Sequence, residues 1–107
     1  GAADAAEDEA DLSLVHFNMD AFTYFVRGFL DEMRGEMTAR ETELIPYSAM
    51  LMTYECGVRF LTDYLCGDTY FRIHRPDHNL IRARNQFAMV RDILQKTPEM
   101  REIVAHI

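Results

Sequence analysis

Three charged residues, Glu55, Arg59 and Asp63, follow one another at intervals of four within an otherwise apolar stretch. On a helix this spacing places them on one face, as two consecutive pairs of opposite charge with the arginine in the middle. One interpretation is a solvent-exposed ladder of ion pairs, each contributing only about 0.3–0.5 kcal/mol. The other is an arginine held by two carboxylates and directed at a polar ligand, because its planar guanidinium offers several donors to oxygen atoms. Spacing alone favours the ladder.

A second cluster of residues with chemical potential has the sequence HRPDHN and runs from His74 to Asn79. Pro76 separates its two histidines, so they cannot form a helical i,i+4 pair, and no further ligand is near enough in sequence to complete a tetrahedral metal site. We therefore expect no metal here. A kinase catalytic loop would need asparagine five residues after the aspartate, where this chain has arginine. The cluster is expected to be a turn in which Asp77 or Asn79 caps the next helix.

No residue of the chain is predicted to be catalytic, because no nucleophile has an activating base beside it. Cys56 lies in an apolar stretch without a neighbouring histidine. Cys56 and Cys66 are ten residues apart on one expected helix, a rise of roughly 15 Å, so they cannot form a disulfide with each other. Free thiols are typical of the cytosol.

Composition and charge exclude two classes of partner. The net charge is -7, and five of the acids fall within the first eleven residues. A net acidic balance argues against nucleic-acid binding, which needs an excess of Lys and Arg. No run of eighteen apolar residues is present for a membrane span, and the acidic N-terminus is unlike a secretory leader. We expect a cytoplasmic protein, in which residues 1–13 are a flexible acidic lead-in and residues 14–107 form one helical subdomain.

Apolar spacing and helix-end signals predict an all-α chain with three main helices and two short ones. The first main helix is expected to begin at Asn18, with Asn18 or Asp20 as its cap, and to be ended by Gly35. A capping box formed by Thr38 and Glu41 starts a short helix. These assignments rest on local side-chain chemistry alone.

The second main helix is expected from Pro46 to Cys66, with Gly67 ending it. It has apolar residues on most of its circumference, so we expect it to be the central, most buried helix. A loop follows over residues 68–76, and the third main helix begins at His78 or Asn79. Thr97 and Pro98 predict a break, after which a last short helix runs to the end of the chain.

Residues 51–93 resemble the C-terminal region of bacterial N-acetylhexosamine 1-kinases, sugar kinases of the aminoglycoside-phosphotransferase and choline-kinase-like superfamily. The most specific strings are C-G-x-R-F-L-T-D-Y-L-x-G-D-x-Y-F, from Cys56 to Phe71, and H-N-L-x-R-x-R-x-Q-F, from His78 to Phe87. Residues 5–30 resemble the segment that follows the metal-binding aspartate of those enzymes. The resemblance implies that this chain is part of the helical C-terminal lobe of a bilobed kinase fold.

The resemblance also implies a function for the charged line. Arg59 and Tyr70, eleven residues apart, match positions that bind the sugar, and Tyr54 matches a position that lines the pocket. Glu55 and Asp63 would then orient Arg59. Such enzymes phosphorylate the anomeric hydroxyl of N-acetylhexosamines with ATP and magnesium, but the nucleotide lobe, the catalytic aspartate of H-x-D-x-x-x-x-N and the metal aspartate are absent from this sequence.

The chain alone is therefore expected to be inactive, to hold no cofactor, and to depend on the N-terminal part of the kinase for ATP and magnesium. Apolar faces that would pack on that part are exposed in the chain alone, so we expect a homo-oligomer. The alternative interpretation is a stand-alone helical interaction or scaffolding module that catalyses no reaction.

Overall fold

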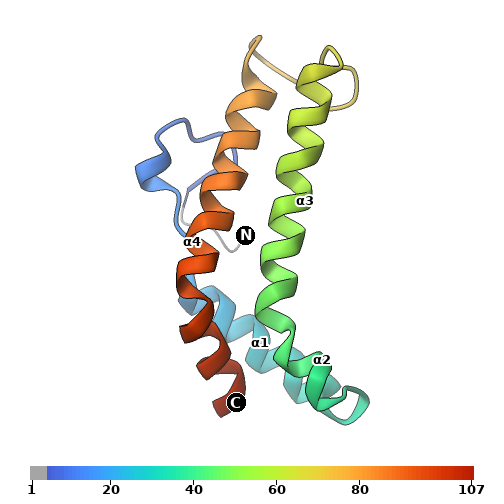
Figure 1. Cartoon of the computed structure of the whole chain (residues 1–107), viewed down its shortest axis with the longest axis vertical. Coiled ribbons are helices and arrows are strands. Elements are labelled where there is room, and N and C mark those ends of the chain that lie inside the picture. The colour runs from blue at the N-terminus through green and yellow to red at the C-terminus, as the bar shows by residue number, and fades with distance from the viewer. Residues whose placement is uncertain (1–4) are drawn as a thin grey trace.

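The computed structural model describes residues 5–107 and is helical, without a strand in this range. Figure 1 shows two long helices, α3 (Ile45–Leu65) and α4 (His78–His106), lying antiparallel and side by side. Helices α1 (Met19–Met33) and α2 (Ala39–Glu43) lie at the end where α3 begins and α4 finishes. Two 3-10 turns, η1 (Leu12–Leu14) and η2 (Arg34–Glu36), flank α1. The predicted all-α class is confirmed.

The predicted N-terminal ends of the first three helices are confirmed. Gly35 does not end the first helix itself, because α1 ends at Met33 and Gly35 lies within η2. The Asn18 side chain accepts from the Ala21 amide at 2.8 Å and caps α1. Thr38 and Glu41 form the complete capping box of α2. Pro46 lies in the first turn of α3, where its missing amide hydrogen leaves no intrahelical bond unmade.

The C-terminus of α3 is a Schellman motif that depends on a glycine. Gly67 has φ of +92°, and its amide donates to the Tyr64 carbonyl. The amide of Asp68 reaches back to the Asp63 carbonyl at 2.8 Å. These are the two bonds that define the motif, and they turn the chain sharply away from the helix axis.

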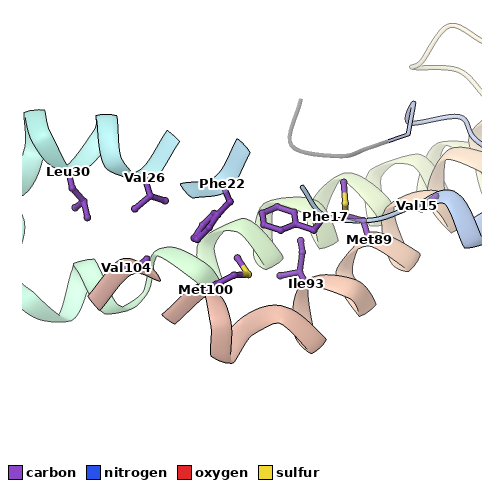
Figure 2. Packing of buried hydrophobic residues seen from close by; sticks show 9 residues of the cluster. All are labelled: Val15, Phe17, Phe22, Val26, Leu30, Met89, Ile93, Met100 and Val104. Carbon is purple, nitrogen blue, oxygen red and sulfur yellow. The ribbon is translucent and has the colours of Figure 1, made fainter. Parts of the chain in front are cut away.

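The hydrophobic core lies between α1, α4 and the segment that precedes α1. Figure 2 shows Phe22, Val26 and Leu30 of α1 facing Met100 and Val104 of α4. The other buried members, Val15, Phe17, Met89 and Ile93, extend the same cluster. The prediction that 46–66 is the most buried helix is wrong. Helix α3 is apolar around most of its circumference, but α4 is its main neighbour and covers only one side of it. The buried residues of α3 are therefore only Pro46, Gly57, Phe60 and Asp63.

The predicted break at Thr97 and Pro98 is also wrong, because α4 continues through both residues to His106. The Thr97 hydroxyl donates to the Ile93 carbonyl at 2.8 Å, within the helix. Beyond the proline, Met100 is fully buried and Val104 is 5% exposed, both against α1. Burial of these side chains holds the last two turns in helical geometry despite the cost of an internal proline.

The acidic lead-in contacts the helical body in the part that the structure describes, although the sequence placed it outside the domain. The Asn85 side chain donates to the carbonyls of Ala6 at 2.9 Å and Glu9 at 3.2 Å. Asp8 lies 3.2 Å from Nε2 of the buried His78. Figure 1 shows this segment beside the N-terminal half of α4. Residues 1–4 lie outside the described range, and the flexibility of the lead-in stays a prediction.

Two further expectations concern surface properties. Cys56 and Cys66 do not pair with each other, as their spacing predicted, and both are exposed. Over residues 5–107, no helix is long and apolar enough to cross a bilayer.

Candidate functional site

The charged line on α3 does not form the predicted ladder within residues 5–107. Glu55 and Arg59 are exposed, whereas Asp63 is only 5% exposed. No ion pair joins any two of the three in this range, and the Asp63 carboxylate is engaged elsewhere. Arg59 is thus left with its guanidinium donors in solvent, not held between two carboxylates.

Asp63 instead fastens the loop that follows α3. Its two carboxylate oxygens accept from the backbone amides of Tyr70, at 2.8 Å, and Phe71, at 2.9 Å. The Schellman turn at Gly67 makes this possible, because it brings the chain back toward the last turn of the helix. One buried carboxylate therefore fixes the backbone seven and eight residues further along the chain.

The protonation of Asp63 follows from this environment. Burial raises the pKa of the Asp63 carboxyl, but amide hydrogen bonds from Phe71, Tyr70 and Thr69 and the side-chain bond from Asn79 lower it by more. The net pKa is below the usual range, so the group is an anion at neutral pH. An anion accepts all of these donors at once, whereas a protonated carboxyl could not.

Asn79 and Arg82 of α4 complete the clamp. The fully buried Asn79 amide donates to Asp63, at 2.8 Å, and to Asp68, at 3.0 Å. Arg82 donates through Nη1 to the Asn79 side-chain oxygen and to the Arg72 carbonyl, and lies over the Phe60 ring at 5.5 Å. The loop is consequently tied to both long helices by charged and polar groups that are largely buried.

Sequence reasoning missed these two residues. Asn79 was predicted as a possible cap, and Asp77 as the other, but Asp77 makes no side-chain cap bond and α4 begins at His78. The amide of His78 donates to the Arg75 carbonyl instead, at 3.1 Å. The string H-N-L-x-R marked the right positions, but nothing in it pointed to Asp63 as their partner.

The two tyrosines predicted to meet the sugar are both accessible. Tyr70 is 75% exposed, and its ring lies edge-on to Phe71 at 4.9 Å. Tyr54 is 49% exposed, with its ring 6.0 Å from Phe87 of α4. Asp63 fixes the backbone of Tyr70. Arg59 lies about one helical turn before Asp63 on α3, a rise of about 6 Å along the helix axis. Whether the three side chains act on one ligand stays a prediction.

A close contact between the two long helices sets the position of this surface. A Cβ on Gly57 would lie 2.6 Å from Cε1 of Phe87, inside any contact that carbon atoms normally make. Glycine at this position lets α3 and α4 approach at the level of Tyr54. Of the charged line on α3, Asp63 alone contacts the clamp residues of α4, through Asn79.

The histidines of the cluster from His74 to Asn79 form hydrogen bonds within the protein. The His74 amide donates to Nδ1 of His78 at 3.1 Å, which assigns the ring proton to Nε2, facing Asp8. Among residues 5–107, no group of three or more His, Cys, Asp or Glu side chains is arranged to hold a metal ion. A hollow of about 1020 Å³ lies at the other end of the molecule, between α2 and the last turns of α4, away from Arg59 and both tyrosines.

A search with models of known protein families found no match to this chain.

Proposed function

We propose that this chain is the sugar-binding helical part of an ATP-dependent phosphotransferase that phosphorylates the anomeric hydroxyl of N-acetylhexosamines. The chain would contribute part of the sugar pocket and would be inactive alone. The observation that carries the proposal is the signature from Cys56 to Phe71, in which one buried residue, Asp63, fastens the segment bearing Tyr70 to the helix bearing Arg59.

The clamp supports a binding role because it reduces the cost of ordering the site. Tyr70 is highly exposed, yet its amide is bonded to a buried anion. A side chain held on a fixed backbone loses less conformational freedom when a ligand binds than one on a free loop. An exposed aromatic ring on a fixed backbone suits the face of a sugar ring.

Arg59 supports the same role through its available donors. No carboxylate lies within ion-pair distance of its guanidinium in residues 5–107. A guanidinium presents its donors in a planar fork that matches pairs of hydroxyl or carbonyl oxygens. Glu55, four residues before Arg59, is also exposed and would orient the arginine only once a ligand orders both side chains.

The chemistry of phosphoryl transfer would belong to the rest of the enzyme. ATP and magnesium supply the phosphoryl group and the charge neutralisation that the reaction needs. Among residues 5–107, no group of three or more His, Cys, Asp or Glu side chains could hold a metal ion. The role of this chain would be to bind and orient the acceptor sugar and to exclude water from one side of it.

The deciding measurement uses the longer enzyme that the proposal implies. The reading frame upstream of Gly1 should encode a nucleotide-binding lobe and an H-x-D-x-x-x-x-N loop. In that enzyme, Arg59→Ala should lower kcat/KM for N-acetylhexosamine by roughly 10- to 100-fold, the effect of losing one or two hydrogen bonds to a charged group.

The matched control is Arg84→Ala, which removes an exposed arginine of α4 that lies in the second string, from His78 to Phe87. It should leave kcat/KM within about twofold. Equal losses in the two variants would refute the role of Arg59. Sugar-dependent release of ADP by the purified 107-residue chain would refute the claim that the chain is inactive alone.

A second candidate, a stand-alone helical interaction module, is favoured by a different observation. Large apolar side chains on α3 are exposed, among them Leu51 at 61% and Leu65 at 73%. A start codon at the beginning of this sequence, without an upstream lobe, would favour this function over the kinase.

A further inference from the structure

The outer face of α3 carries an apolar stripe with a coiled-coil period. Its six residues are separated by intervals of 4, 3, 4, 3 and 4: Tyr47, Leu51, Tyr54, Val58, Leu61 and Leu65. The same helix packs on α4 through Gly57 and Phe60, which lie about 80° and 140° around the helix axis from the middle of the stripe. Tyr54, at the edge of the stripe, also contacts Phe87 of α4. Five members of the stripe are between 39% and 73% exposed, and Leu61 is half-buried.

An unbroken alternation of three and four residues is the pattern of a helix that packs lengthwise against one other helix. If α3 packed on α4 alone, one apolar face toward α4 would be enough, and the residues of the stripe could be polar. No element within residues 5–107 covers the stripe sufficiently to bury it. We propose that α3 pairs in antiparallel orientation with α3 of a second copy of this chain, along this stripe.

The order of residues in the stripe favours a second copy. In antiparallel pairing centred between Tyr54 and Val58, each Tyr54 faces Val58 of the other copy, and each Leu51 faces Leu61. Tyr47 likewise faces Leu65 at both ends. Every layer of the seam is filled, and each large ring meets a smaller aliphatic side chain, which is how facing positions interdigitate. Parallel pairing would instead place tyrosine against tyrosine.

The area of the stripe is consistent with a dimer. Covering the five exposed side chains on both copies would bury on the order of 1,000 Å², the lower bound for a specific interface. Glu55 is the charged residue nearest the seam. In the antiparallel order each Glu55 lies across the seam from Glu55 of the other copy, offset by about 3 Å along the axis, and Arg59 of that copy lies at a similar offset but further from the seam.

The inference goes beyond the proposed function and does not rest on it, because it involves no sugar. Tyr54 belongs both to the seam and to the proposed sugar pocket, and the two proposals use different parts of its side chain. The seam needs its ring, whereas a sugar pocket would use its hydroxyl. Tyr54→Phe should therefore leave the dimer intact.

The test is the mass of the 107-residue chain in solution, measured by light scattering coupled to size exclusion. The wild type should have twice the 12.5 kDa chain mass. Leu51→Glu and Leu65→Glu, made separately, should each weaken the dimer more than about tenfold, because each places two charges in an apolar seam. Both positions are exposed in the single chain, so circular dichroism should show unchanged helix content.

The control is Leu94→Glu, which charges a leucine on α4 that is 53% exposed and lies outside the stripe. It should leave the dimer unchanged. A monomeric wild type, or a dimer that Leu51→Glu and Leu94→Glu weaken equally, would overturn the inference.

Orientation is tested by cross-linking in a background with both native cysteines changed to serine. Ser48→Cys and Thr62→Cys lie on the same flank at opposite ends of the stripe. A short bismaleimide should join a Ser48→Cys chain to a Thr62→Cys chain when the two are mixed. Neither variant should cross-link to itself, because its two cysteines would be roughly 20 Å apart along the axis. Self-cross-linking of each variant would refute the antiparallel seam.

Discussion

Adding a single methyl group at Gly57 should test how closely α3 and α4 are packed. Alanine in the middle of a helix is favoured over glycine by about 1 kcal/mol. At this position its Cβ would lie 2.6 Å from Cε1 and 2.9 Å from Cδ1 of Phe87. The ring would have to move, and overpacking of this kind costs about 1–3 kcal/mol. Gly57→Ala should therefore lower the free energy of unfolding by about 0–2 kcal/mol.

The same substitution should have the opposite sign once the ring is removed. In a Phe87→Ala background the new methyl group meets no side chain at that distance, so Gly57→Ala should stabilise the chain by about 1 kcal/mol. The coupling between the two sites would then be about 1–3 kcal/mol. Urea unfolding followed by circular dichroism measures the free energy of unfolding of all four variants of the cycle. If the wild type is dimeric, the cycle is measured in a Leu51→Glu background, in which the dimer is weakened.

Gly28 provides the matched control, because it lies in α1 and a Cβ there would meet nothing within 4 Å. Gly28→Ala should stabilise by about 1 kcal/mol, which corresponds to a rise in Tm of about 4–8 °C for a domain of this size. If Gly57→Ala stabilises as much as Gly28→Ala, or if the effects at Gly57 and Phe87 are additive, the close approach of the helices is refuted.

Two further predictions concern α4. Burial raises the pKa of the Asp92 carboxyl, but bonds from Lys96, at 2.7 Å, and from the Phe17 amide, at 2.6 Å, lower it by more. Because the folded-state pKa of Asp92 is depressed, its stabilisation is present above the unfolded pKa of about 3.9 and is lost as pH falls through the folded pKa. Asp92→Asn should therefore make the free energy of unfolding depend less on pH between pH 5 and 2, and an unchanged acid dependence would contradict this. Pro98→Ala should stabilise the chain by about 1–3 kcal/mol in urea unfolding, because it restores an amide donor inside a continuous helix, and a destabilised variant would show that the helix needs the proline.

The parts of the fold that sequence predicted are those decided by neighbouring residues. Asn18 and Thr38 cap their helices through amides three residues away, and Gly67 ends α3 through its own φ. These interactions need no knowledge of tertiary structure. They are the same whichever helices pack together, so local side-chain chemistry identifies them.

The incorrect predictions depended on which elements pack together. The break at Pro98 would hold for an isolated helix, but burial of Met100 against α1 keeps α4 continuous. The stretch 46–66 reads as core because it is apolar all round, yet the chain provides one long helix to cover it. Helix periodicity reveals that two faces are apolar, but not which of them the fold will bury.

The candidate site shows the same limit at the level of single residues. Spacing identified Asp63 as a partner for Arg59, four residues away, because i,i+4 pairs are the contacts that helical periodicity reveals. The actual donors are amides across a turn and a side chain sixteen residues later. Several donors in a buried position outcompete one exposed guanidinium, since each unmade bond there would leave a desolvated polar group.

This competition has a consequence for how the surface of α3 is divided. With Asp63 committed to the loop, Arg59 is released to the flank of the helix, about 100° around the axis from Val58 in the apolar stripe. The stripe, the flank and the α4-facing side are therefore three separate surfaces of one helix. Antiparallel pairing along the stripe would leave Arg59 at the rim, where its several donors can meet a polar ligand. A buried aspartate that secures the loop is thus also the reason that the arginine is available for binding.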